Sequence, residues 1–191
     1  MNAATTDTTI DPVTARRRID RTIADLIDGI SPEQRTAQTP CEEWNVDQLV
    51  AHMVGGGHMI AAGLLGEQPA ADDDPLAGGL AAAWSATTAH LAEASTPEIL
   101  EATHHMPFGD VPGAMALSVI TADHIVHAWD LATALGVDTE IGEDLVALTM
   151  GVFGPLAPAD DRTGGQFKDV VDVPATASAL DRMIGFSGRR P

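Results

Sequence analysis

Residues 112–135 read PGAMALSVITADHIVHAWDLATAL, and this stretch decides the fold of the chain. Pro112 suits the first turn of a helix, and Gly136, directly after the stretch, suits its end. The 24 residues would form a helix about 36 Å long at 1.5 Å per residue. We therefore expect this helix to lie at the centre of a helical bundle.

Helix signals recur along the rest of the chain. Asp11-Pro12 is a cap followed by a first-turn proline, and apolar residues then recur at spacings of three and four as far as Ile30. Asn45 and Gln48 have the spacing of a capping box. We predict helices over residues 12–30, 45–65 (weakened or bent at 55–57), 80–94, 142–156 and 177–186, with a short helical turn after residue 96.

The intervening segments are short or irregular. Residues 104–112 read as extended chain with a turn at 108–110, and residues 67–79 read as an exposed loop. Residues 160–173 read as irregular, with one short strand at 170–171. The pattern predicts an all-α fold and a single domain over residues 1–191, with a bundle in about 12–158 and a small C-terminal extension in about 159–191.

Charge and cysteine content limit the classes of partner and location. The formal net charge is −18, from 28 acidic and 10 basic residues, which repels nucleic acid and anionic lipid. Cys41 is the single cysteine, which fits a reducing cytoplasm. Residues 1–9 lack the features of a signal peptide, and residues 48–66 lack the sustained apolarity of a membrane span. We expect a soluble cytoplasmic protein whose partner is a small molecule and whose helical faces could support a homodimer.

Asp123 and His127 are the first candidate metal ligands. They stand four residues apart, so on a helix both side chains project from one face. A carboxylate and an imidazole presented together can hold a divalent ion, and His52 on another helix is a candidate third ligand. The alternatives are a simple ion pair between Asp123 and His127, and a core histidine at 52 that bonds a backbone carbonyl or Asp130.

The remaining polar and aromatic side chains have weaker cases. His58 is rotated away from the face of His52 and suits the solvent side or a pocket rim, while His90 reads as a surface residue. His104 and His105 could rim a site. Cys41 suits a structural role in a loop, and the alternatives for its thiol are a nucleophile or a fourth metal ligand. The three tryptophans read as core anchors, with the last of them also able to exclude water from a metal: Trp44, Trp84 and Trp129.

Several stretches of the chain resemble a known family. Thr39-Pro40-Cys41-Glu42-Glu43-Trp44-Asn45-Val46-Asp47-Gln48-Leu49-Val50-Ala51-His52 resembles the N-terminal signature of the metal-binding domain of mycothiol-dependent maleylpyruvate isomerases, in the DinB/YfiT-like superfamily. An actinobacterial branch of that family, composed mainly of uncharacterised metal-binding proteins, is similar over residues 107–113, 122–131 and 181–191.

The resemblance implies a four-helix up-down-down-up bundle that holds a metal, usually zinc and sometimes nickel or iron. The implied ligands are His52, Asp123 and His127. The isomerase has glutamate where this chain has the shorter Asp123, and His124 could replace a ligand if the helix were rotated. The isomerase also has a C-terminal domain that contributes to its active site, for which this chain has too few residues, so its isomerase activity is not carried over.

Three functions are compatible with this reading. The first is a metal-dependent S-transferase that uses a thiol of the mycothiol type, with the thiol implied by the resemblance. The second is a metal-dependent hydrolase in which Asp130 or His124 acts as general base. The third is a non-enzymatic protein that binds a metal or small ligand. In each of them, the turn in residues 107–113, with Phe108, could shape the mouth of the pocket.

Overall fold

The protein is mostly helical, as the sequence predicts. The computed structural model describes residues 10–68, 74–159, 162 and 168–191. Residues 1–9 and parts of the predicted 67–79 loop and C-terminal extension lie outside the described residues. The elements are α1 (Pro12–Asp28), the 3-10 helix η1 (Gln34–Thr36), α2 (Val46–Leu65), α3 (Leu80–Glu93), α4 (Pro97–Glu101), β1 (Thr103–Met106), β2 (Gly109–Pro112), α5 (Gly113–Leu135), α6 (Glu143–Leu156) and α7 (Ala179–Phe186).

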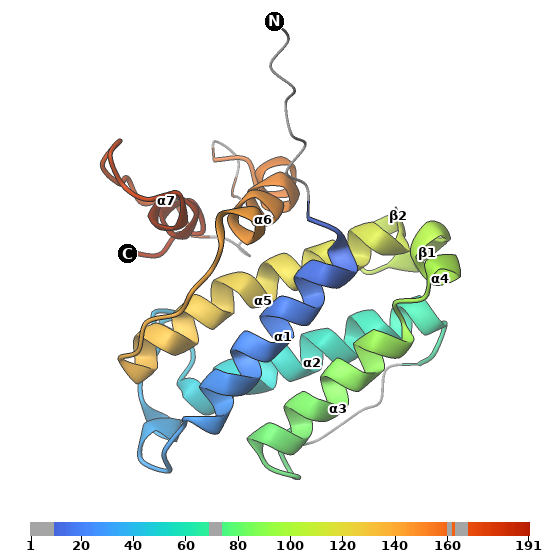
Figure 1. Ribbon diagram of the computed structural model, residues 1–191, viewed down its shortest axis with the longest axis horizontal. Coiled ribbons are helices and arrows are strands. Elements are labelled where there is room, and N and C mark those ends of the chain that lie inside the picture. The colour runs from blue at the N-terminus through green and yellow to red at the C-terminus, as the bar shows by residue number, and fades with distance from the viewer. Residues whose placement is uncertain (1–9, 69–73, 160–161, 163–167) are drawn as a thin grey trace, which may run out of the picture.

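Helix α5 lies at the centre of the arrangement and packs against α1, α2 and α6. Helices α1 and α5 run in one direction, and α2 and α3 run in the other (Figure 1). Helix α7 packs against α6, outside the group formed by α1, α2, α3 and α5. Strands β1 and β2 form an antiparallel hairpin before the first turn of α5.

The helix ends follow the capping signals. The Asp11 side chain accepts a hydrogen bond from the Thr14 amide, and Asn45 and Gln48 form the complete capping box. Helices α2 and α5 both end at a glycine in the left-handed conformation, Gly66 at φ 71° and Gly136 at φ 69°, which a residue with a Cβ atom adopts less readily.

The glycines of α2 permit close packing, and the helix is continuous from Val46 to Leu65. A Cβ atom added at Gly57 would lie 2.3 Å from Cγ2 of Thr87 on α3. The backbone of α2 can therefore approach α3 only because this position has no side chain. The predicted extent of the helix to residue 65 is confirmed, and packing against α3 offsets the low helix propensity of the glycines at 55–57.

Helix α2 is more apolar than the sequence reading supposed. Its mean hydropathy reaches 1.2 over an 18-residue window, which by length and composition would allow a membrane span. Half of that window is buried inside the protein, with Leu49, Val50 and Met53 fully enclosed. The apolarity is that of a core helix, and a core helix passes the same composition test.

The segment before α7 differs from the prediction. No strand forms at Val170 and Val171, which are irregular chain. The amide of Val171 instead donates a single hydrogen bond to the carbonyl of Gly185. Gly185 belongs to a helix, so this hydrogen bond cannot be followed by the further backbone hydrogen bonds that pair two strands. Helix α7 begins at Ala179, where Ser178 and Asp181 form a second capping box.

A buried polar network connects α1 to α5 and α2. Arg16 is 3% exposed, and its Nη1 donates to Nδ1 of His124 over 2.8 Å. Nε2 of His124 donates to the carbonyl of Met53 over 3.0 Å, and Arg16 also pairs with Asp20. Burial, followed by the charge of Arg16, lowers the pKa of His124 well below its usual value. His124 is therefore neutral, and both of its nitrogens have partners.

This network predicts the effect of removing His124. The variant His124→Ala leaves a buried donor of Arg16 without its acceptor, so the free energy of unfolding should fall by about 2 kcal/mol in urea titrations. Arg35→Ala, which breaks the exposed pair with Asp47, should have little effect. Full stability in His124→Ala would contradict this account.

Candidate metal centre

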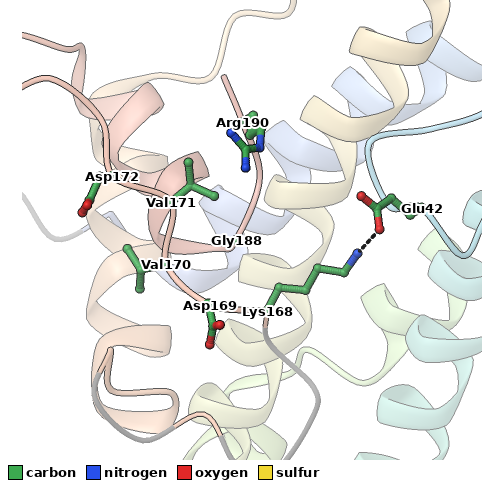
Figure 2. A pocket seen from close by; sticks show the side chains of 8 residues that line it. All are labelled: Glu42, Lys168, Asp169, Val170, Val171, Asp172, Gly188 and Arg190. Atoms are coloured by element: carbon green, nitrogen blue, oxygen red, sulfur yellow. Dashed lines mark hydrogen bonds and ion pairs between the residues drawn. The ribbon is translucent and has the colours of Figure 1, made fainter.

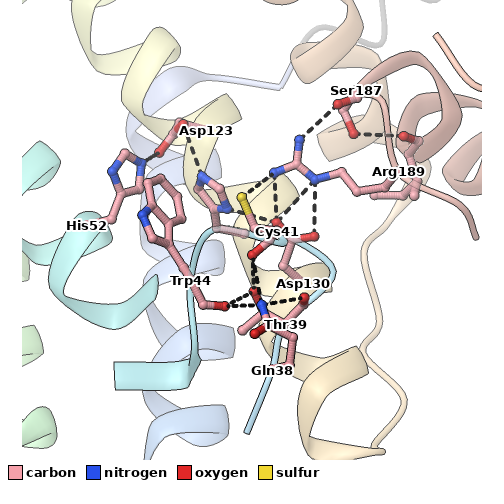
Figure 3. Close-up of polar contacts among 11 residues, drawn as sticks. Gln38, Thr39, Cys41, Trp44, His52, Asp123, Asp130, Ser187 and Arg189 are labelled. Atoms are coloured by element: carbon pink, nitrogen blue, oxygen red, sulfur yellow. Dashed lines mark hydrogen bonds and ion pairs between the residues drawn. The ribbon is translucent and has the colours of Figure 1, made fainter. Parts of the chain in front are cut away.

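The three predicted ligands lie together between α2 and α5. One donor atom from each of His52, Asp123 and His127 lies within 4.8 Å of the others. Nε2 of His52 is 3.5 Å from Oδ2 of Asp123, and Nε2 of His127 is 3.5 Å from Oδ1 of the same carboxylate. Figure 3 shows the side chains of His52 and Asp123 pointing toward each other. That the three bind a metal stays a prediction.

The packing of two helices brings the three side chains together. Asp123 and His127 are one turn apart on α5. Helix α2 packs against α5 in the opposite direction and brings His52 beside Asp123. The His127 side chain is 7% exposed, whereas those of Asp123 and His52 are 31% and 35% exposed. The cluster therefore has a buried side at His127 and an open side toward solvent.

The geometry of the cluster suits a small divalent ion. Bonds of 2.0–2.1 Å in a tetrahedral site place neighbouring ligand atoms about 3.4 Å apart, close to the two separations of 3.5 Å. These separations exceed a good hydrogen bond. Nε2 of His52 is shielded from solvent and has no hydrogen-bond partner among the described residues. An ion would satisfy this nitrogen.

Electrostatics keep the carboxylate ionised. Burial alone would raise the pKa of Asp123, but His127 and then His52 and His124 outweigh it, so the pKa lies well below its usual value. An ionised carboxylate and two imidazole nitrogens are donors that zinc accepts.

Asp130 supports His127 from behind. Nδ1 of His127 donates to Oδ2 of Asp130 over 2.9 Å, and Asp130 is fully buried. Burial alone would raise the pKa of Asp130. The hydrogen bonds from His127 and Arg189 outweigh burial, so the pKa lies below its usual value and the carboxylate is ionised. A carboxylate on the far nitrogen of a histidine directs the other nitrogen toward a metal. Here that nitrogen is Nε2, on the side of Asp123.

Arg189 completes this support. Its Nε donates to both oxygens of Asp130 over 3.1 and 3.2 Å, and its Nη2 donates to Oδ2 over 2.8 Å (Figure 3). The sequence suggested Asp130 as a partner for His52 or as a general base. The pairing with His52 is wrong, because the buried carboxylate is engaged by His127 and Arg189. The same contacts weaken the case for Asp130 as a general base.

His124 does not reach the cluster. Its nitrogens bond Arg16 and Met53, so it neither replaces a ligand nor serves as a general base. The helix is not rotated in the way that such a replacement requires, because Asp123 and His127 already face His52.

Trp44 has a larger role than the sequence indicated. Its ring stacks on His52, with centroids 4.3 Å apart and an interplanar angle of 28°, and lies 5.6 Å from the ring of His127. It covers the cluster while also packing on the core. The sequence assigned the exclusion of water to Trp129, but the ring contacts with both histidine ligands come from Trp44.

Cys41 lies near the supporting residues. Its sulfur is 3.9 Å from Nη2 of Arg189, and its carbonyl accepts a hydrogen bond from the hydroxyl of Thr39. Burial raises the pKa of the Cys41 thiol, which Arg189 partly offsets. A raised pKa leaves less thiolate at neutral pH, which favours the loop role over a nucleophile.

The other histidines lie elsewhere. Nδ1 of His58 is 3.0 Å from Nδ1 of His90, and Nε2 of His90 is 3.1 Å from Glu67. His104 bonds the carbonyl of Ile99, and His105 bonds Asp110 within the hairpin. The contacts of His104 and His105 are local, because each joins residues five positions apart in the chain. Neither of these two histidines therefore rims the cluster.

The hairpin turn is also far from the cluster. Phe108 is 43% exposed in the connection between β1 and β2. The first residue of α5, Gly113, is about 15 Å from Asp123 along the helix axis at 1.5 Å per residue. The expectation that this turn shapes the pocket mouth is therefore wrong.

A surface groove of about 780 Å³ borders the cluster's supporting segments without including the ligands. Figure 2 shows Lys168 extending to Glu42, and their charged atoms are 2.9 Å apart. The lining carries both signs of charge: Glu42, Lys168, Asp169, Val170, Val171, Asp172, Gly188 and Arg190. A mixed lining of this kind does not indicate one class of ligand.

Comparisons with known proteins agree with this fold. Residues 16–132 match the sequence model of the family described as "Mycothiol maleylpyruvate isomerase N-terminal domain". The uncharacterized protein Rv0738 of Mycobacterium tuberculosis strain H37Rv is 32% identical over 185 residues, covering 94% of this chain and 98% of that protein. The uncharacterized protein MT0763 of strain CDC 1551 matches to the same extent.

Two solved structures share this fold. The crystal structure of the mycothiol-dependent maleylpyruvate isomerase has a TM-score of 0.58, with 14% identity and coverage of 78% of this chain and 69% of that chain. A histidine-to-alanine mutant of that enzyme has a TM-score of 0.62 and 14% identity, with coverage of 81% and 71%. At this identity, the likeness concerns the fold.

The pKa of His127 predicts how the stability of the chelator-treated protein depends on pH. Burial lowers the pKa of His127, but Asp123 and Asp130 outweigh burial and raise the pKa to about 9. Because this value exceeds the unfolded value of about 6.5, the stabilisation is complete below pH 6.5 and is lost as the pH rises through 9. Urea titrations should show a loss of about 3 kcal/mol across that window. The variant His127→Gln should lack this dependence, and an identical pH profile in both proteins would contradict the assignment.

Proposed function

The chain belongs to the mycothiol maleylpyruvate isomerase N-terminal domain family, and on that premise we propose that it binds one divalent metal ion and acts on a small molecule. The proposed ligands are His52, Asp123 and His127. The observation that carries the proposal is their preorganisation, with two ligand separations of 3.5 Å and a shielded nitrogen of His52 that has no hydrogen-bond partner among the described residues.

Zinc suits the donor set best. Two imidazole nitrogens and one carboxylate oxygen match zinc, and nickel and ferrous iron accept the same donors. A set of three protein ligands leaves at least one coordination position for another molecule. The exposed parts of His52 and Asp123 lie on the side from which such a molecule would enter.

The proposed activity is transfer involving a low-molecular-weight thiol of the mycothiol type. A bound zinc ion would supply Lewis-acid chemistry, lowering the pKa of a coordinated thiol or water toward neutrality. The residues of the chain orient and shield the centre. Asp130 keeps Nε2 of His127 directed at Asp123, and Trp44 covers the ring of His52. The thiol comes from the family relationship, and the cytoplasmic location is part of the same proposal.

A hydrolase has weaker support. The sequence offered Asp130 and His124 as general bases, and both side chains are buried and engaged by other residues. No described feature favours a non-enzymatic role over the transferase. The experiments below distinguish the hydrolase and the non-enzymatic binding protein from the transferase. The homodimer stays a prediction.

Elemental analysis should find one equivalent of metal in protein purified without a histidine tag. Asp123→Asn keeps the shape of the side chain but removes its charge, so bound metal should fall to a small fraction of an equivalent, as it should in His52→Ala and His127→Ala. The control is His105→Ala, which removes an exposed imidazole bound only within the hairpin. Full occupancy in the three ligand variants would exclude this centre.

Activity should depend on both metal and thiol. Zinc-loaded protein incubated with a low-molecular-weight thiol and a panel of electrophiles should give a conjugate, detected by mass spectrometry. Chelated wild-type protein and His52→Ala should give only the uncatalysed background. Ester or amide cleavage without thiol would instead identify a hydrolase. Tight ligand binding without turnover of any substrate would identify a binding protein.

A further inference from the structure

We propose that Arg189 is a positioning residue of this metal centre, acting through Asp130 on the ligand His127. The inference rests on the proposed metal function and adds to it a residue that no ligand motif contains. It also makes the segment after α7, which ends in Arg189, Arg190 and Pro191, part of the centre.

The contacts form a continuous chain from Arg189 to the ligand. Two nitrogens of the guanidinium group hold the carboxylate of Asp130 at 2.8 to 3.2 Å, in a forked arrangement. Oδ2 of Asp130 accepts the hydrogen bond of His127 over 2.9 Å. A forked pair fixes the plane of a carboxylate as well as its distance. The direction of the His127 ring therefore depends on Arg189 through one shared carboxylate.

Burial makes this dependence strong. The Asp130 side chain has no exposed surface, and that of Arg189 is 15% exposed. Removing the cation would leave a buried carboxylate with one of the three donors that the described residues supply, which is costly away from water. We expect the Asp130 side chain to turn toward other donors or water, and His127 would then lose its fixed orientation.

The backbone after α7 holds Arg189 in place. Its amide donates to the carbonyl of Ile184 over 3.1 Å, and its Nη1 donates to the carbonyl of Ser187 over 2.9 Å. Gly188 turns the chain at φ 86°, and a Cβ atom there would lie 2.7 Å from Cβ of Lys168. A left-handed residue without a side chain is therefore needed just before Arg189.

A second role for Arg189 would be to anchor α7 to α5, with no effect on the metal. The two roles differ in what they change. Anchoring alters the stability of the protein and leaves the metal affinity of the folded protein unchanged. Positioning alters that affinity and does so only while Asp130 is present. A double-mutant cycle on metal affinity therefore separates the two roles.

The experiment measures zinc affinity by competition with a chromophoric chelator for wild type, Arg189→Gln, Asp130→Asn and the double variant. Supporting residues of metal ligands contribute about 10- to 100-fold in affinity. We expect Asp130→Asn to fall in this range, Arg189→Gln to lose about tenfold, and the double variant to bind no more weakly than Asp130→Asn alone. Arg190→Gln, at the exposed neighbouring arginine, is the matched control and should bind as wild type does.

The outcomes separate this inference from the proposed function. Wild type that binds no zinc would overturn both. Wild-type binding with unchanged affinity in Arg189→Gln, or losses that add in the double variant, would overturn the role of Arg189 alone. If Arg189→Gln does not fold, Arg189→Lys retains the charge without the fork. It should also bind zinc several-fold more weakly, and wild-type affinity in this variant would overturn the role.

Discussion

The structure depends on a set of polar side chains placed on a buried helix. Helix α5 is enclosed on most sides, yet it carries His124, His127 and Asp130, each 5% exposed or less. Every such group must find a partner, because an unpaired polar group away from water is costly. Arg16 on α1 reaches His124, and Arg189 after α7 reaches Asp130. The elements around α5 are therefore held to it by specific polar contacts as well as by apolar packing.

These contacts divide α5 into two functional faces. His124 faces α1 and α2, where it is neutral and serves packing. Asp123 and His127 face His52, whose Nε2 has no hydrogen-bond partner in the described part of the chain and meets an ionised carboxylate there. Adjacent residues in one motif thus have different roles, since a step of one residue on a helix turns the side chain by about 100°.

Local signals in the sequence predicted the helices well. The caps at Asp11 and Asn45 and the stop at Gly136 depend on neighbours within a few residues, so the sequence contains all of their information. The spacing of Asp123 and His127 likewise follows from helix geometry. The meeting with His52 followed from the family resemblance, because sequence spacing alone does not say which helix faces which.

The misassignments involve contacts between distant segments. A buried Asp130 required a cation. Nothing in the sequence near Asp130 indicated that Arg189, 59 positions later in the chain, would supply it. Trp44 was read as core, because stacking on His52 depends on how the loop before α2 folds back. Gly57 was read as a weak point in a helix, since the nearness of Thr87 on α3 cannot be seen from α2 alone.

The distribution of the ligands over two helices has a consequence for the chain as a polymer. His52 and Asp123 are about 70 residues apart, so an ion held by both would close a large loop and act as a reversible cross-link. Closing a loop of that length in the unfolded chain corresponds to about 4 kcal/mol of conformational entropy. A protein with a single cysteine cannot form an internal disulfide. In this chain, coordination of an ion by residues of α2 and α5 would restrain the unfolded chain as a disulfide between the two helices would.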